Sequence, residues 1–300
     1  MKCICCLSNK ILPRPLGLDD YYGCLNCGFV FTGMDKRGDD RGNLVTHYQN
    51  VDPHETVAKY KQSFFISALR YLSSRCHKKK KTILDVGCGY GYFLDLAARK
   101  GWDTSGIEVV SDAVGAAERR IGKGNIFHGT LKEARYPDNS FDAISLWDVL
   151  FIVENPFEEL RECYRILKEG GVIGIRVRNV FFQKVVYQVY SPLKKIASRL
   201  GLRNPSVFHP FCFSRKALFQ LLRRVGFSYI QITNSPLTEG DPYWYTDIKV
   251  LTKVAKRLTG LVSGLVFWMS GGSMVIGPSI LVWAEKPQSK MKSKRVKPRG

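Results

Sequence analysis

Residues 83–91 read Ile-Leu-Asp-Val-Gly-Cys-Gly-Tyr-Gly, an apolar strand that runs into glycines at alternate positions. Gly87, Gly89 and Gly91 let a backbone turn tightly and approach a ligand closely, and the helix expected next has an N-terminus that favours polar ligand groups. Glu108 ends the following apolar strand, where the ribose of a nucleotide needs a hydrogen-bond acceptor. The stretch therefore predicts a binding site for a nucleoside-containing cofactor.

The spacing of the glycines narrows the choice of cofactor. They follow the pattern G-x-G-x-G, whereas the dinucleotide fingerprint is G-x-G-x-x-G. Asp85 stands just before them, and its carboxylate would repel a pyrophosphate but suit the amino group of a methionine moiety. These residues resemble the first motif of the class I S-adenosylmethionine-dependent methyltransferases. The resemblance implies that S-adenosylmethionine is bound by Asp85, the three glycines and Glu108.

Later segments extend the resemblance in the same order along the chain. Gly129-Thr130-Leu131 follows a short strand, and residues 160–171 read like a helix-to-strand signature of small-molecule methyltransferases. The resemblance implies that Thr130 and Leu131 lie near the adenine, Leu131 by apolar contact. In the signature helix Asn155 is a suitable N-cap, and Gly170 suits a left-handed stop.

The core alternates strands with helices, which predicts an α/β fold. We expect a doubly wound, mostly parallel, seven-stranded Rossmann-like sheet, and the resemblance implies that residues 227–233 and 280–285 form its antiparallel edge. A helix over residues 56–74 is expected to cover one mouth of the cofactor site. Ser214 is expected to cap a second helix that ends at Gly226.

Two Cys-x-x-Cys pairs near the start have the spacing of a two-knuckle zinc site. The expected ligands are Cys3, Cys6, Cys24 and Cys27. Cys5 is an alternative to Cys3 or Cys6. Four thiolates close the coordination sphere, so we expect a structural zinc that serves as the core of a small ribbon over residues 1–34.

A ribbon ahead of this core resembles bacterial methyltransferases that act on nucleotide-sugars, polysaccharide precursors and other secondary metabolites. The resemblance implies a small-molecule acceptor, such as a sugar, a polysaccharide precursor or a lipid-linked intermediate. The expected domains are a ribbon (1–34), a linker and covering helix (35–80), a methyltransferase core (81–286) with a helical lid insert near 235–270, and a basic tail (287–300).

The chain departs from its relatives after the fourth strand. Where many of them have Asp-x-x-Glu-His, residues 148–152 read Asp-Val-Leu-Phe-Ile. The missing pair would be a base or a metal ligand, so we expect catalysis that does not depend on a metal. The remaining candidates for a general base are Asp148, at the end of the strand, and His209, in the loop Phe208-His209-Pro210-Phe211.

The formal net charge of +20 leaves other functions open. An RNA or protein methyltransferase is one alternative, although no stacking set accompanies a basic stripe and no Asn-Pro-Pro-Tyr-like motif follows the fourth strand. A scaffold that keeps the cofactor fold without catalysis is another. Arg75 and residues 78–81 are expected in a solvated basic loop. No secretory signal is evident, which predicts a cytoplasmic protein in a reducing compartment.

One apolar segment raises the alternative of a membrane-spanning helix. Residues 258–284 contain no charged side chain, a length that can span a bilayer. Glycines at 271 and 272 interrupt it, so we expect a helix over 250–269, a turn and the last strand. The basic leading half of this helix could lie on the inner face of a membrane, as a peripheral contact, or cover a greasy acceptor.

Overall fold

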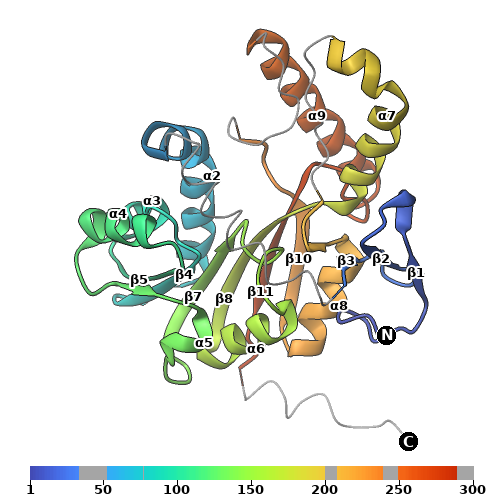
Figure 1. Ribbon diagram of the computed structural model, residues 1–300. Helices are drawn as coiled ribbons and strands as arrows, with labels where there is room; N and C mark the ends of the chain where they lie inside the picture. Colours follow the sequence, from blue (N-terminus) through green and yellow to red (C-terminus); the bar gives the residue numbers. More distant parts are fainter. Residues whose placement is uncertain (34–52, 77, 200–207, 239–248, 289–300) are drawn as a thin grey trace, which may run out of the picture.

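The computed structural model describes residues 1–33, 53–76, 78–199, 208–238 and 249–288. Within these ranges a central sheet has the strand order β10-β11-β8-β7-β4-β5-β6 (Figure 1). Its parallel strands are β4 (Lys81–Val86), β5 (Trp102–Glu108), β6 (Ile126–His128), β7 (Phe141–Trp147) and β8 (Leu167–Arg178). β11 (Ser279–Glu285) runs antiparallel to both β8 and β10 (Ser228–Asn234). The predicted seven-stranded sheet and its antiparallel edge are confirmed.

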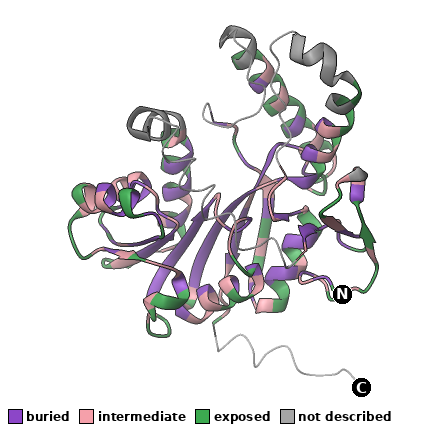
Figure 2. Cartoon of the chain, in the orientation of Figure 1, coloured by how far each residue is buried: buried purple, intermediate pink, exposed green. Residues whose placement is uncertain are grey.

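Helices cover both faces of this sheet. The helices on the two faces are α2 (Pro53–Arg75), α3 (Tyr92–Ala98), α4 (Ser111–Ile121), α5 (Leu131–Ala134), α6 (Pro156–Ile166) and α8 (Arg215–Val225). α7 (Val180–Arg199) and α9 (Lys249–Met269) project beyond the end of the sheet (Figure 1). α2 contacts α3 and α3 contacts α4, whereas α6 contacts α5 and α8. A hydrophobic core lies on each face of the sheet, and successive strand residues point alternately into one core and the other. Ile83 packs in the core beneath α2, α3 and α4, and Leu84 in the core beneath α6 and α8. The strands are buried accordingly (Figure 2).

Local sequence signals account for several of the helix ends in the described residues. The Asn155 side chain accepts hydrogen bonds from the amides of the first turn of α6, and Ser214 Oγ accepts one from Ala217 N at 3.0 Å. Gly226 ends α8 with φ 119°. Gly170 has the left-handed conformation expected of it, with φ 75°, but it does not stop the helix, because α6 ends at Ile166 and Gly170 lies within β8.

The N-terminal segment forms a second sheet together with a strand of the core. Its order is β1 (Ile11–Pro13), β2 (Tyr21–Cys24), β3 (Val30–Thr32) and β9 (Phe211–Cys212), with a 3-10 turn at Pro15–Gly17 between β1 and β2. Phe29 is fully buried, and its ring centroid lies 6.1 Å from that of Phe211 and 5.1 Å from that of Phe213. The ribbon therefore has apolar packing shared with the core, which corrects the expectation that a metal alone forms its interior.

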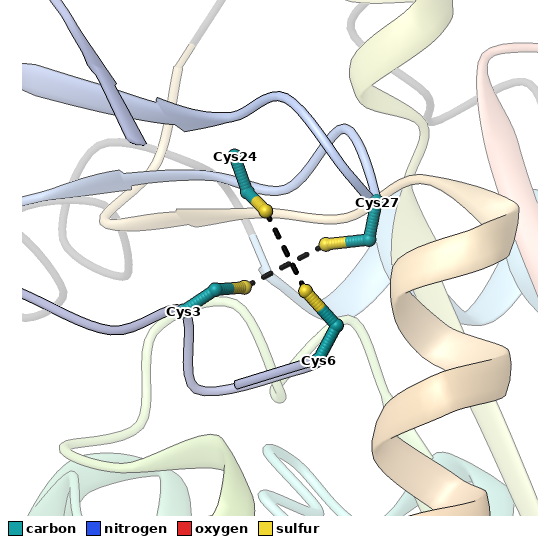
Figure 3. A group of neighbouring side chains, drawn as sticks. All are labelled: Cys3, Cys6, Cys24 and Cys27. Atoms are coloured by element: carbon teal, nitrogen blue, oxygen red, sulfur yellow. Dashed lines mark hydrogen bonds between the residues drawn. The ribbon is translucent and has the colours of Figure 1, made fainter. Parts of the chain in front are cut away.

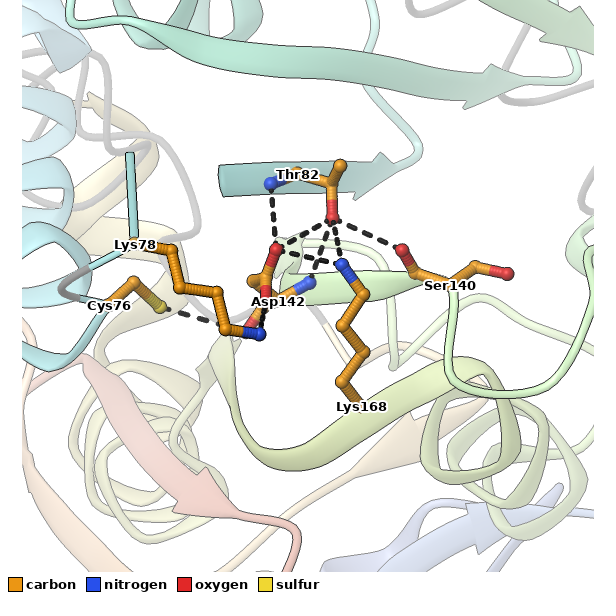
Figure 4. A network of polar contacts seen from close by, with 6 residues as sticks. All are labelled: Cys76, Lys78, Thr82, Ser140, Asp142 and Lys168. Atoms are coloured by element: carbon orange, nitrogen blue, oxygen red, sulfur yellow. Dashed lines mark hydrogen bonds and ion pairs between the residues drawn. The ribbon is translucent and has the colours of Figure 1, made fainter. Parts of the chain in front are cut away.

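A polar network ties the amino ends of the parallel strands together (Figure 4). Asp142, at the start of β7, accepts hydrogen bonds from Thr82 N at 3.0 Å, Lys78 Nζ at 2.7 Å and Lys168 Nζ at 2.9 Å. Burial alone raises the pKa of Asp142, but these donors outweigh it and lower the pKa to about 2. Residues 78–81 are thus not simply a solvated loop, because Lys78 is in this network and Lys81 begins β4.

α9 ends at Met269 as expected, followed by Gly271 and Gly272 at φ 59° and 80° and then by β11. Among the helices that the structure describes, none is long and apolar enough to cross a membrane. Most of the expected linker (35–52), part of the lid insert (239–248) and most of the basic tail (289–300) lie outside the described residues.

Candidate functional site

The turn after β4 has the backbone conformation that the sequence predicts. Gly87, Gly89 and Gly91 have φ values of 70°, 53° and 75°, in the region that side chains disfavour. A Cβ at Gly87 would lie 2.4 Å from Val149 Cγ2, and one at Gly91 would lie 3.2 Å from Ala117 Cβ. Glycine is therefore required by neighbouring atoms as well as by conformation. Val149 and Ala117 thus pack directly against the backbone of this turn.

Glu108 lies against this turn. Its Oε2 accepts a hydrogen bond from Gly89 N at 2.9 Å, and its Oε1 accepts from Val109 N at 2.8 Å and Val110 N at 3.0 Å. The residue is 4% exposed. Three amide donors fix the carboxylate beside the glycines, so the structure brings together the two features that the sequence assigned to one site.

Asp85 lies in β4 immediately before the glycines and is buried. Its Oδ1 accepts a hydrogen bond from Ser145 Oγ at 2.6 Å, from the adjacent strand β7. Burial, reinforced by the charge of Glu108, raises the pKa of Asp85 to about 7 in spite of the Ser145 hydrogen bond. A cationic group that arrived beside this carboxyl would favour its ionised form.

The Asp85→Asn variant should stabilise the protein without ligand and weaken cofactor binding. The folded pKa of about 7 lies above the reference value of 3.8, so ionisation costs stability as pH rises through this interval and costs nothing below it. Asparagine still accepts from Ser145 but never ionises. We expect the unfolding midpoint to rise by roughly 2 to 4 °C near pH 8 and to stay unchanged near pH 4.

Differential scanning fluorimetry across pH, with and without S-adenosylhomocysteine, tests this expectation. The matched control is Asp103→Asn, at an exposed position of neighbouring β5. This variant should change neither the unfolding midpoint nor the binding of S-adenosylhomocysteine. A destabilised Asp85→Asn protein near pH 8 would contradict the account.

Thr130 and Leu131 lie where β6 leads into α5. Thr130 caps this helix: its Oγ1 accepts from Glu133 N at 3.4 Å, and Glu133 Oε2 accepts from Thr130 N at 2.7 Å. Leu131 is 1% exposed. Gly129 N donates to Glu108 O at 2.9 Å, which places this turn beside the end of β5. A contact of Thr130 or Leu131 with adenine stays a prediction.

Asp148, directly after β7, is held by two cations. Its Oδ2 lies 2.5 Å from Arg176 Nη1 and 2.8 Å from Lys61 Nζ. Burial alone raises the pKa of Asp148, but Arg176 and Lys61 outweigh it and hold the pKa well below its usual range. A carboxylate held in this way is a weak proton acceptor.

His209 lies in the segment that leads into β9. Its ring centroid is 4.4 Å from that of Phe151, and Phe211 N donates to Phe151 O at 3.3 Å. Phe151 follows β7 by only a few residues, so these contacts bring His209 to the same end of the sheet as Asp148. The sequence did not reveal Lys61, Arg176 or Ser145 as part of this region. An arginine inside the apolar strand at 172–177 was the one available signal.

The four thiols of the N-terminal ribbon converge on one point (Figure 3). The Sγ atoms of Cys3, Cys6, Cys24 and Cys27 all lie within 4.8 Å of one another. Cys3 and Cys27 are 3.6 Å apart, and Cys6 and Cys24 are 3.5 Å apart. A tetrahedral zinc with Zn–S bonds of about 2.3 Å requires sulfurs about 3.8 Å apart, so these residues fit the ion. Cys5 lies outside the group, which favours Cys3 and Cys6 over it as ligands.

The family described as "Methyltransferase domain" matches residues 57–232, more than half of the chain. A ubiquinone biosynthesis O-methyltransferase of an Azoarcus species is 25% identical over 193 residues, which cover 60% of this chain and 82% of that relative. A probable S-adenosylmethionine-dependent methyltransferase of Mycolicibacterium smegmatis is 31% identical over 108 residues, covering 36% of this chain and 41% of the relative.

Two solved structures show the same fold at low identity. The plantazolicin methyltransferase BpumL, in complex with a pentazolic desmethylPZN analog and S-adenosylhomocysteine, has a TM-score of 0.51 at 16% identity, covering 85% of this chain and 98% of its own. The phosphoethanolamine N-methyltransferase 2 of Haemonchus contortus, in complex with S-adenosyl-L-methionine, has a TM-score of 0.51 at 17% identity, covering 75% of this chain and 53% of its own. Because the family match spans most of the sheet and the strand order agrees with it, the chain belongs to the methyltransferase domain family and is a class I S-adenosylmethionine-dependent methyltransferase.

Proposed function

We propose that this protein transfers a methyl group from S-adenosylmethionine to a small-molecule acceptor: a sugar, a polysaccharide precursor or a lipid-linked intermediate. The observation that carries the proposal is the carboxylate of Glu108 bound to Gly89 N, beside a turn in which side chains would clash. S-adenosylmethionine supplies an electrophilic methyl group when bound. The named ubiquinone biosynthesis relative supports an oxygen atom of the acceptor as the methylated atom.

The residues of this chain would then have distinct tasks. The glycine turn and Glu108 would hold the nucleoside, and Asp85, ionised by a nearby ammonium, would hold the amino acid part. Holding both ends fixes the direction in which the methyl group can leave, and this alignment is the main contribution that such a transfer needs from a protein. Four cysteine thiolates would hold a structural zinc, which closes their coordination and takes no part in the transfer.

His209 is the candidate for the group that removes a proton from the acceptor. Imidazole titrates near neutral pH, whereas Arg176 and Lys61 keep Asp148 ionised and weakly basic. Asp148 would instead keep the two cations in place at the end of β7. Of the two residues that the sequence suggested as bases, His209 would thus be the base and Asp148 a positioning residue.

The test uses S-adenosylmethionine labelled in its methyl group and three acceptor probes: a simple phenol, a nucleotide-sugar and a polyprenyl-linked sugar. Label should appear in one of them, with or without EDTA. His209→Ala should slow single-turnover transfer by about 10²- to 10⁴-fold, the usual contribution of a placed base. Asp148→Asn should change the KM for the acceptor more than the rate of transfer.

Wild-type transfer by His209→Ala would contradict the base assignment, and stimulation by added Mg²⁺ would contradict the metal-independent mechanism. Retained S-adenosylhomocysteine binding without transfer to any probe would favour a scaffold, and transfer to RNA instead would favour the alternative suggested by the net charge of +20.

A further inference from the structure

Helix α9 presents an apolar face to solvent. Seven of its large apolar side chains are between 46% and 77% exposed: Val254, Leu258, Leu261, Val262, Leu265, Trp268 and Met269. At 100° per residue they fall on one stripe along the helix. Green parts of α9 in Figure 2 mark exposed residues of this helix, which projects from the end of the sheet (Figure 1).

The opposite face of α9 holds the helix to the domain through polar groups. Lys256 is 8% exposed and Ser263 is 5% exposed. Lys256 Nζ donates to Thr238 O at 3.3 Å, and Asn234 Nδ2 donates to Ser263 O at 2.9 Å. Phe267 adds an apolar contact with the core on this side. An amphipathic helix of a globular domain ordinarily buries its apolar stripe, and this one exposes it.

The charge beside the exposed stripe has one sign. Lys253 and Arg257 are exposed and lie next to the stripe by helical spacing, and residues 249–284 contain no Asp or Glu. α7 also exposes apolar side chains, with Phe181, Val185 and Val189 exposed by 44% to 61% at four-residue intervals. Apolar side chains flanked by cations match a layer of acyl chains under anionic headgroups.

We propose that the exposed face of α9, assisted by the first turns of α7, docks this protein on an anionic lipid bilayer. A second copy of the chain fits the surface less well, because two faces with only positive charge would repel each other. Trp268, at 77% exposed, suits the boundary between headgroups and acyl chains. The helix lies on the bilayer and does not cross it.

The position of α9 connects docking with the chemistry. α7 follows the carboxyl end of β8, and α9 precedes β11, which is antiparallel to β8. Both helices therefore connect to the sheet at the carboxyl ends of its parallel strands, the end that carries the glycine turn and Asp148. If the protein is the methyltransferase proposed above, on which this step rests, docking turns its acceptor side to the membrane and favours a lipid-linked acceptor over a freely dissolved one.

Co-sedimentation of the full-length protein with vesicles tests the proposal. Vesicles of phosphatidylcholine mixed with phosphatidylglycerol should bind the protein, and vesicles of phosphatidylcholine alone should bind it much more weakly. The variants Leu261→Glu and Trp268→Glu should each lower binding to the anionic vesicles by about tenfold or more, since each replaces a large apolar side chain with an anion. Lys253→Gln with Arg257→Gln should reduce the dependence on phosphatidylglycerol.

The matched control is Leu25→Glu, which alters an equally exposed leucine (67%) in the ribbon and should leave vesicle binding unchanged. Every variant should keep the wild-type affinity for S-adenosylhomocysteine, so a failure of docking stays distinct from a failure of the proposed function. Absence of vesicle binding by the wild type, an equal loss in Leu25→Glu, or a wild-type dimer that Leu261→Glu converts to monomer would each overturn the proposal.

Discussion

The Glu108→Ala variant should bind S-adenosylhomocysteine about 10- to 150-fold more weakly than the wild type. Its carboxylate would accept from the ribose and already fixes Gly89 N, Val109 N and Val110 N, and a hydrogen bond to a charged group contributes about 1.5 to 3 kcal/mol. Titration calorimetry measures the loss directly. The affinity of Glu108→Gln should lie between those of the wild type and Glu108→Ala, because glutamine retains a hydrogen-bond acceptor but carries no charge.

Gly89→Val is the companion change, and it should abolish measurable binding. A control is needed because a valine at φ 53° strains any backbone. Gly101 supplies it: its φ is 77°, and a Cβ there meets no atom within 4 Å. Gly101→Val should therefore lose comparable stability and keep its affinity. Unchanged affinity in both Glu108→Ala and Gly89→Val would refute the cofactor site.

Loss of the metal should have the largest effect on stability. Purified protein is expected to contain about one zinc, and Cys24→Ser should contain none, since three thiolates no longer close a tetrahedron. The damage should extend beyond the ribbon, because Phe29 packs on Phe211 and Phe213 and β3 pairs with β9. Metal analysis together with hydrogen exchange of residues 208–213 would report both effects.

Cys5→Ser is the control for this change. Cys5 is as buried as Cys3 but lies outside the four-sulfur group, so its variant should keep the zinc and a protected β9. Zinc absent from wild-type protein prepared without chelators would count against the metal centre. Zinc retained by Cys24→Ser would count against this ligand set.

The parts of the fold that rest on local chemistry were accessible from the sequence. The glycine spacing after β4, the caps Asn155 and Ser214 and the two Cys-x-x-Cys pairs each act within a few residues, and the structure places them as predicted. The doubly wound, mostly parallel, seven-stranded sheet followed from the family resemblance together with the alternation of strands and helices.

Interactions between distant residues were not accessible. Lys61 and Asp148 are separated by 87 positions, and Ser145 reaches Asp85 across 60. Nothing in the periodicity of either segment specifies a partner at that distance. The two-residue strand β9 also has no sequence signal, because a strand so short is defined by its pairing with β3 and not by its composition. Gly170 takes the expected left-handed conformation, but the sequence did not show that α6 ends before it and that the chain turns within β8.

The pairing of β3 with β9 limits how such an enzyme can be recombined. β9 begins two residues after His209 and ends just before the cap of α8, so the ribbon supports the backbone that carries the proposed base. A ribbon taken from another protein would need its own match for Phe29 and for the edge of β3. Residues 1–33 and 208–213, though nearly 200 positions apart, must therefore be exchanged together. A chimera that takes only one of the two segments from another protein loses the packing of both.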